Sequence, residues 1–263
     1  MYTFTYERPA SAADAGKLAA SGAKVLAGGQ TLLASMKLRL ASPPVLADLG
    51  GIAELSGICR DGNALVIGAM TRHAVVAASA EVQQTIPALA ELAGHIGDRQ
   101  VRAMGTLGGS VANNDPSACY PSAVLALGAT VVTTQRSISA DDFFQGMFTT
   151  ALQEDEIITS IRFPIPKRAA YMKFKQPASR FAMIGVFVAQ FDTGVRVAVT
   201  GSGNGVYRDA ALEAALGRSF TPEAAAAVPI DAAGMSSDIH ASAAYRANLV
   251  SVQTQRAVAK ALR

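Results

Sequence analysis

Two glycine pairs occupy similar settings in this chain, Gly28-Gly29 in AGGQTLL and Gly108-Gly109 in GTLGGSVANNDP. Each pair follows a short apolar run and leads into a hydroxyl residue, Thr31 or Ser110. Because glycine has no Cβ, the backbone N–H groups of such turns can converge on an anion. Two turns of this kind can hold the two phosphates of a pyrophosphate from both sides. The pattern therefore predicts a dinucleotide cofactor.

Each glycine pair also has a plainer interpretation as an ordinary turn. In that interpretation Thr31 caps the helix after the first pair, and Asp115 caps the helix after the second. The polar run that contains Asn113 and Asp115 suits the sugar hydroxyls of a nucleotide, which favours a ligand at the second pair.

A third glycine-rich stretch, GSGNG at 201–205, lies between an expected strand and an expected helix. It does not match the Rossmann fingerprint, because Val206 stands at the third glycine position. The chain also lacks the Gly-Lys-Ser/Thr of a P-loop. We interpret 201–205 as a structural turn.

Composition excludes several classes of function. The net charge of +3 is spread without a basic block, which argues against nucleic-acid binding. No apolar run approaches the roughly 20 residues of a membrane span, and the N-terminus shows no signal-peptide pattern, so we expect a soluble, cytoplasmic chain. The two cysteines, Cys59 and Cys119, are too few for an iron–sulfur cluster, and three scattered histidines indicate no metal site.

The order of expected elements divides the chain into a mixed α+β arrangement. The first 54 residues predict strands at 2–6, 23–27 and 45–48 alternating with helices at 11–20 and 31–40. The middle predicts, among others, helices at 87–96 and 116–127 and strands at 130–134 and 157–163. Beyond a boundary at 164–167 come strands at 171–175, 182–191 and 195–200, then helices at 208–216, 222–227 and 243–262, which predicts a separate α+β domain.

Four segments together resemble the FAD-binding medium subunits of molybdenum hydroxylases, the family of the carbon monoxide dehydrogenase medium subunit and the xanthine dehydrogenase FAD-binding subunit. They are KVLAGGQTLLASMKLRL, IGDRQVRAMGTLGGSVANNDPSACYPSAVLALGA, DDFFQGMFTTAL and YMKFKQPASRFAMIGV, and SDIHASAAYRANL matches the family's C-terminal domain. The resemblance implies a two-part FAD-binding domain of the vanillyl-alcohol-oxidase (PCMH) type at 1–166, with subdomains at about 1–54 and 55–166. A smaller α+β domain is expected at 167–263.

The resemblance also implies where FAD contacts the chain. The pyrophosphate is expected against two stretches of backbone, and further residues are expected along the nucleotide and the two ring systems: Ala27, Gly28, Gly29, Gln30, Thr31, Leu32, Thr106, Gly108, Gly109, Ser110, Asn113, Asp115, Cys119, Ile158, Lys175 and Phe181. Spacing alone favours a solvated lysine at Lys175 and a core ring at Phe181. The resemblance instead implies that Lys175 lies near the pyrimidine edge of the flavin and Phe181 beside the isoalloxazine ring, with Ile158 near the adenine.

Two positions depart from the family pattern. Many relatives have Asp where this chain has Cys119, at a position near the ribose or adenine, so one hydrogen bond to a sugar is in doubt. Asn is common where Ala103 stands. Neither change touches the glycine pairs, so FAD binding is expected to survive.

The implied function is electron transfer by an FAD-carrying subunit of a heterotrimeric molybdenum hydroxylase. An iron–sulfur small subunit would deliver electrons, a molybdenum-cofactor large subunit would oxidise the substrate, and two heterotrimers would form a dimer. Such a subunit needs no catalytic acid–base pair, and none is evident. Two alternatives stay open at this level: a stand-alone FAD-dependent oxidase, and a flavin-free binding or assembly module on the same fold.

Overall fold

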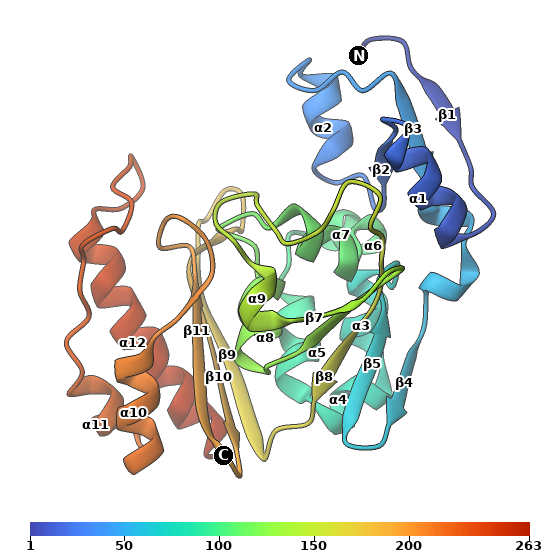
Figure 1. The fold of residues 1–263 in the computed structure, drawn as a ribbon. Helices are drawn as coiled ribbons and strands as arrows, with labels where there is room; N and C mark the ends of the chain where they lie inside the picture. Colours follow the sequence, from blue (N-terminus) through green and yellow to red (C-terminus); the bar gives the residue numbers. More distant parts are fainter.

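A computed structural model describes all 263 residues and contains three separate β-sheets (Figure 1). The sheets follow one another along the chain: β1–β3 form the first, β4–β8 the second and β9–β12 the third. Helices accompany each sheet, so the α+β class expected from the sequence is confirmed. None of the helices combines the length with the apolar character that a membrane span requires.

The first sheet is small and parallel. Its strands are β1 (Thr5–Glu7), β2 (Lys24–Leu26) and β3 (Val45–Asp48), in the spatial order β1-β3-β2. The helices α1 (Ala12–Ala20) and α2 (Leu32–Lys37) make the crossovers that parallel strands require. Two short 3₁₀ turns, η1 (Leu49–Gly51) and η2 (Ala53–Leu55), lead into the next sheet.

The second sheet has five antiparallel strands in the order β4-β5-β8-β6-β7. A helical insertion separates β5 from β6 and packs beside the sheet (Figure 1). The strands are β4 (Ile58–Asp61), β5 (Ala64–Gly68), β6 (Thr130–Thr133), β7 (Ser137–Ser139) and β8 (Ile158–Pro164), and the helices are α3 (His73–Ala78), α4 (Ala80–Thr85), α5 (Pro87–Gly94), α6 (Arg99–Met104), α7 (Leu107–Asn113), α8 (Tyr120–Ala126) and α9 (Ala140–Phe143).

The third sheet is antiparallel, in the order β12-β11-β10-β9, and three helices lie along one face of it (Figure 1). The predicted order of strands followed by helices is confirmed. The elements are β9 (Arg168–Lys175), β10 (Ala182–Phe191), β11 (Gly194–Thr200), β12 (Tyr207–Arg208), α10 (Ala210–Arg218), α11 (Pro222–Ala226) and α12 (Ala243–Ala261).

Strand β10 is buried on both faces, which explains its nearly continuous apolar sequence. Phe187 and Ala189 join the largest hydrophobic core, together with the helical insertion and the second sheet. Val186 and Val188, on the opposite face, join a second core with helices α10, α11 and α12. The third sheet therefore packs between its own helices and the rest of the molecule.

Candidate functional site

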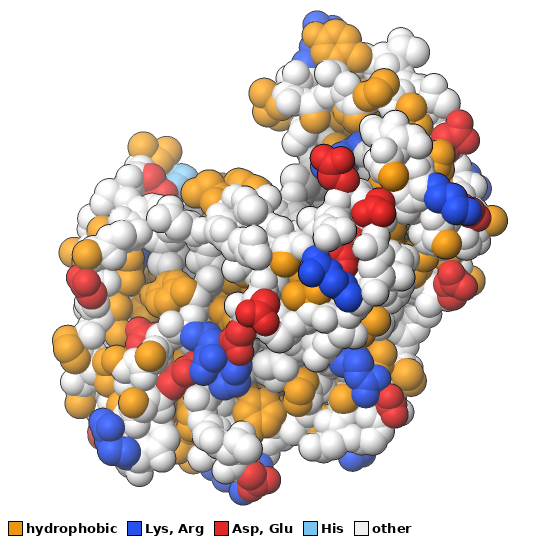
Figure 2. Space-filling view, in the orientation of Figure 1, with side chains coloured by type: hydrophobic (Ala, Val, Ile, Leu, Met, Phe, Trp, Pro, Cys, Tyr) orange, Lys and Arg blue, Asp and Glu red, His pale blue; other side chains and the backbone are white.

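A cavity of about 980 Å³ is lined by residues from all three parts of the chain. The part with β1–β3 contributes the first glycine pair, the helical insertion contributes the second, and the β9–β10 loop contributes 179–181. Figure 2 shows the deep hollow between the lobe that carries β1–β3 and the rest of the molecule. This volume lies at the upper end of the range of small-molecule and cofactor sites.

The structure brings nearly all of the predicted cofactor-binding residues to this one cavity. The residues that line it are Ala27, Gly28, Gly29, Gln30, Thr31, Leu32, Thr106, Gly108, Gly109, Ser110, Asn113, Asp115, Cys119, Ile158 and Phe181. Lys175 does not line it. Contact of each residue with a cofactor stays a prediction.

The first glycine pair lies in the bend between β2 and α2, where Gly29 has a φ of +73°. None of the five successive backbone N–H groups from Gly28 to Leu32 donates a hydrogen bond within the protein. The side chain of Thr31 makes no capping bond, so the interpretation of Thr31 as a helix cap is wrong. Five free donors on one bend form a concave site that suits an anion.

The second glycine pair does not form a turn, and that part of the prediction is wrong. Gly108 and Gly109 lie in the first turn of α7, which Thr106 caps. Their N–H groups are already used: Gly108 donates to the Ala69 carbonyl at 2.8 Å, and Gly109 donates to Thr106 Oγ1 at 3.2 Å. The two glycine pairs are therefore not equivalent as sources of free donors.

The glycines of both pairs are needed for close packing of the two segments. A Cβ on Gly28 would overlap Met104 O and lie 2.7 Å from the Cα of Gly105. A Cβ on Gly109 would lie 3.2 Å from the Cβ of Ala27. The first motif thus rests directly against the start of the second. A larger residue at Gly28 would separate them.

The helix expected at 116–127 begins later than predicted, because α8 starts at Tyr120. The Asp115 carboxylate accepts the Ser117 N–H at 2.8 Å, and its carbonyl accepts the Ala118 N–H at 2.9 Å. These bonds close a tight turn that competes with helix formation. Asp115 therefore shapes the cavity wall and does not cap α8.

Cys119 and Lys173 meet at the cavity wall. The Lys173 ammonium donates to the His95 carbonyl at 3.1 Å and approaches Cys119 Sγ at 3.2 Å. Lys173 lines the cavity, whereas Lys175 is exposed at the end of β9. The two lysines share one face of the strand because side chains alternate with a period of two.

Two further residues that line the cavity, His73 and Phe148, were not predicted from the sequence. His73 is buried, and its burial, with a smaller effect from Arg102, lowers its pKa to about 4, so its imidazole is neutral. His73 Nδ1 has no partner in the protein. Phe148 is 56% exposed and has a φ of +53°, an unusual value for a bulky residue.

Asn114 holds the loop that carries Phe148. It is fully buried in a left-handed conformation, and its Nδ2 donates to the Gly146 and Thr149 carbonyls at 2.7 and 2.8 Å. Its own carbonyl accepts the Phe148 N–H. An Asn in a polar run is typical of a left-handed turn residue, but the sequence does not predict that Asn114 bonds to Gly146, 32 residues away.

These residues fit FAD. Free amides suit a pyrophosphate, the apolar surfaces of Phe148, Ile158 and Phe181 suit ring systems, and the ammonium of Lys173 adds a positive charge. The protein has no group of three or more His, Cys, Asp and Glu side chains that could hold a metal ion.

Comparison with known proteins supports the same class. Residues 2–166 match the family model described as the FAD binding domain in molybdopterin dehydrogenase. The chain is 35% identical to the carbon monoxide dehydrogenase medium chain of Hydrogenophaga pseudoflava, across 97% of this chain and 96% of that protein. It is 36% identical to the nicotine 6-hydroxylase medium subunit of Paenarthrobacter nicotinovorans, with the same coverage.

Solved structures agree with the sequence relatives. Carbon monoxide dehydrogenase from Hydrogenophaga pseudoflava superposes with a TM-score of 0.91 across 99% of this chain and 98% of that chain. Quinoline 2-oxidoreductase from Pseudomonas putida 86 gives a TM-score of 0.90 at 29% identity, across 99% of this chain and 97% of that chain.

The fold and the cavity define a flavin-binding subunit of an oxidoreductase. The chain belongs to the family of FAD-binding medium subunits of molybdenum hydroxylases, as the resemblance predicted. FAD is its cofactor, and it acts as the flavin-carrying subunit of a molybdenum-dependent dehydrogenase.

Proposed function

We propose that FAD lies in the cavity with its pyrophosphate against the five free amides of Gly28 to Leu32. These unpaired donors are the observation that carries the proposal, because five adjacent N–H groups without acceptors lose no internal hydrogen bond when an anion binds. The second motif supplies the facing wall through Thr106 and Ser110 at the start of α7.

The remaining predicted residues have complementary roles in this proposal. Asn113, Asp115 and Cys119 lie along the nucleotide. Ile158 lies near the adenine, and Phe181 lies beside the isoalloxazine ring. Support comes from their shared position around one cavity.

Lys175 is proposed to act from the rim as a positive charge near the pyrimidine edge of the flavin. It is the last residue of β9, two residues from Lys173, which reaches the cavity. Both lysines contribute to lowering the pKa of His95, after the effect of its partial burial and against the opposing charge of Glu91. The charges of Lys175 and Lys173 therefore both act on the same imidazole, that of His95.

Bound FAD stores and releases electrons, and the protein binds it, orients it and limits its access to water. We propose that electrons arrive from iron–sulfur clusters on a small subunit, after substrate oxidation at a molybdenum centre on a large subunit. This chain then passes them to an external acceptor. A dimer of heterotrimers is the proposed assembly, and the cytoplasm its proposed location. Free Cys59 and Cys119 are consistent with a reducing compartment.

The proposed domain boundaries are 1–166 for the FAD-binding domain, with subdomains at about 1–54 and 55–166, and 167–263 for the C-terminal domain. They are supported by the sheets, since β8 ends at Pro164 and β9 begins at Arg168.

Reconstitution tests the proposed site. The full chain, stripped of cofactor and titrated with FAD, is expected to bind it with a visible flavin spectrum. A chain that retains its fold but shows no saturable FAD binding would refute the proposed site. Capture of the native complex, followed by iron and molybdenum analysis, tests the partners separately.

A further inference from the structure

The GSGNG loop at 201–205 and the SDIHASAAYRANL segment have no place in the function described so far. In the structure they meet at one buried arginine, Arg246, on the first turn of α12. Arg246 is 5% exposed. A buried guanidinium requires acceptors for its donors, so its partners indicate what it organises.

Arg246 bonds to the ends of two neighbouring strands. The paired register of β10 and β11 stops at Gly185 opposite Thr200. Beyond this point, Arg246 Nη1 donates to the Gly201 carbonyl at 2.7 Å and to the Met183 carbonyl at 3.0 Å. The guanidinium thus replaces the missing ladder and holds the two strand ends together.

Asp238 fixes the arginine from the opposite side. Its Oδ2 accepts from Arg246 Nη2 at 2.7 Å, and its Oδ1 accepts the backbone N–H groups of His240 and Ala241 at 2.9 and 3.0 Å. Hydrogen bonds from His240 and Ala241, together with the charge of Arg246, hold the pKa of Asp238 below its usual value, although partial burial opposes this. The carboxylate is therefore ionised and accepts three hydrogen bonds.

The same strand ends hold the wall of the cofactor cavity. The Gly201 N–H donates to the Pro116 carbonyl at 2.8 Å, and the Ala182 N–H donates to the Ser117 carbonyl at 3.3 Å. Ser117 lines the cavity, and so do its neighbours Asp115, Ala118 and Cys119. Gly201 has a φ of +89°, which only glycine adopts without strain, and a Cβ there would lie 2.6 Å from the Ala182 carbonyl.

We propose that Asp238, Arg246 and Gly201 form a strut through which the C-terminal domain positions the 115–119 wall of the FAD site. Arg246 is a positioning residue, because it acts on the cavity only through Gly201 and the start of β10. The inference rests on the proposed FAD site. It assigns the GSGNG loop and the SDIHASAAYRANL segment a common role in cofactor affinity.

The test compares FAD affinity in three full-length variants. Arg246→Met keeps much of the aliphatic stem but removes every donor, and we expect about tenfold weaker FAD binding in titrations of the apo chain. Arg246→Lys, which keeps the charge and one donor group, should recover part of this loss. Arg256→Met is the matched control, since Arg256 is an exposed residue of the same helix, and its FAD affinity should equal that of the unchanged chain.

A second readout separates positioning from general stability. In Arg246→Met, amide hydrogen exchange should accelerate at 115–119 while the centre of α12 keeps its protection. If Arg246→Met does not fold, Asp238→Asn gives the test, because asparagine can still accept from His240 and Ala241. We then expect about threefold weaker FAD binding for Asp238→Asn.

If Arg246→Met folds and binds FAD as tightly as the unchanged chain, the proposed strut is overturned. If Arg246→Met does not fold, unchanged FAD affinity in Asp238→Asn overturns it. Loss of affinity without faster exchange at 115–119 would overturn it too. If the unchanged chain and Arg256→Met also fail to bind FAD, the proposed site fails. The two failures are therefore distinguishable.

Discussion

Gly28 has little space for any side chain, because the backbone of Met104 and Gly105 lies directly against it. We predict that Gly28→Ala weakens FAD binding by more than tenfold, as the added methyl group forces the two glycine motifs apart. FAD titration of the apo chain measures the effect. Gly217→Ala in α10 is the matched control, since a Cβ there meets nothing within 4 Å. Equal FAD affinity in both variants would contradict the prediction.

Lys175 and Lys173 are predicted to affect different properties of the flavin. A unit charge ~4 Å from a reduced anionic flavin contributes about 4 kcal/mol at an effective dielectric of about 20, and 30 mV corresponds to about 1.4 kcal/mol for a two-electron couple. Solvent screening reduces this strongly for the exposed Lys175. We predict that Lys175→Ala lowers the flavin midpoint potential by on the order of tens of millivolts without abolishing FAD binding.

Lys173→Ala is the comparison, because Lys173 is held by His95 and Cys119 at the cavity wall. We expect it to weaken FAD binding more than it changes the potential. Redox titration and binding titration of both variants separate the two effects. An unchanged potential in Lys175→Ala would exclude its role in tuning the flavin.

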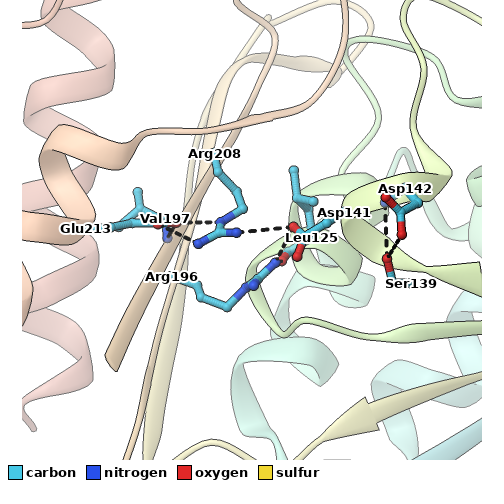
Figure 3. A network of polar contacts seen from close by, with 8 residues as sticks. All are labelled: Leu125, Ser139, Asp141, Asp142, Arg196, Val197, Arg208 and Glu213. Atoms are coloured by element: carbon cyan, nitrogen blue, oxygen red, sulfur yellow. Dashed lines mark hydrogen bonds and ion pairs between the residues drawn. The ribbon is translucent and has the colours of Figure 1, made fainter. Parts of the chain in front are cut away.

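At the scale of elements, a charged network joins α9 to the third sheet and α10 (Figure 3). Arg196 donates to Asp141 at 2.6 Å and to the Leu125 carbonyl at 2.8 Å, while Arg208 bridges Asp141 and Glu213. Burial acts to raise the pKa of Asp141, but Arg196 and Arg208 together hold it below its usual value. Asp141 in its ionised form therefore stabilises the contact of α9 with the third sheet and α10.

Asp141→Asn removes these ion pairs and should lower the melting temperature at neutral pH by about 2 °C. The effect is small because the carboxylate is half exposed and its ion pairs are screened by solvent. Because the pKa of Asp141 is lower in the folded protein than in the unfolded chain, its ionised form stabilises the fold. This stabilisation is complete above the unfolded pKa near 3.8 and is lost as the pH falls through the folded pKa. The difference between the two proteins should therefore shrink below pH 4. Thermal melts from pH 7 to pH 3 test this.

Asp142→Asn is the neighbouring control. The Asp142 side chain bonds only to Ser139, at the start of its own helix (Figure 3). Its carboxylate accepts from the Ser139 hydroxyl, and its N–H donates to the same oxygen. We expect a smaller loss of melting temperature for this variant than for Asp141→Asn. A pH-independent difference for Asp141→Asn would contradict the ionic explanation.

The elements show where sequence patterns were sufficient. The long apolar strands β10 and β11 and the helix α12 were predicted within a residue or two, since their periodicity is strong. The region of the second glycine pair was not. Local chemistry there favours a turn, but Thr106 caps a helix and Ala69 accepts the Gly108 N–H from outside it. The start of α7 includes such a long-range contact, whereas the late start of α8 comes from the local turn that Asp115 closes.

At the scale of the whole molecule, the cavity exists because three parts of the chain surround it. The two glycine motifs meet there with different hydrogen-bonding states, which gives a further prediction. FAD should strongly slow amide hydrogen exchange at Gly28 to Leu32, whose N–H groups are free. Protection at Gly108 and Gly109 should change much less, since these amides are already bonded within the protein.

Exchange measured by mass spectrometry with and without FAD tests this asymmetry. Residues 250–261 of α12 serve as an internal reference, because this part of the helix does not line the cavity and lies beyond Arg246. Equal protection at both glycine motifs would contradict the assignment of the pyrophosphate to the first.

The sequence by itself determined the class of fold, the family, the cofactor and the two glycine motifs. These depend on local residue patterns, which can be identified without knowing which distant segments come into contact. The tertiary structure decided which amides are free, which lysine reaches the cavity and how Arg246 bonds to the strand ends near the site. Each of these depends on contacts between segments far apart in the chain. The glycine pairs look alike in sequence, yet only the first offers unpaired donors, since the Ala69 carbonyl and the Thr106 hydroxyl already occupy those of the second.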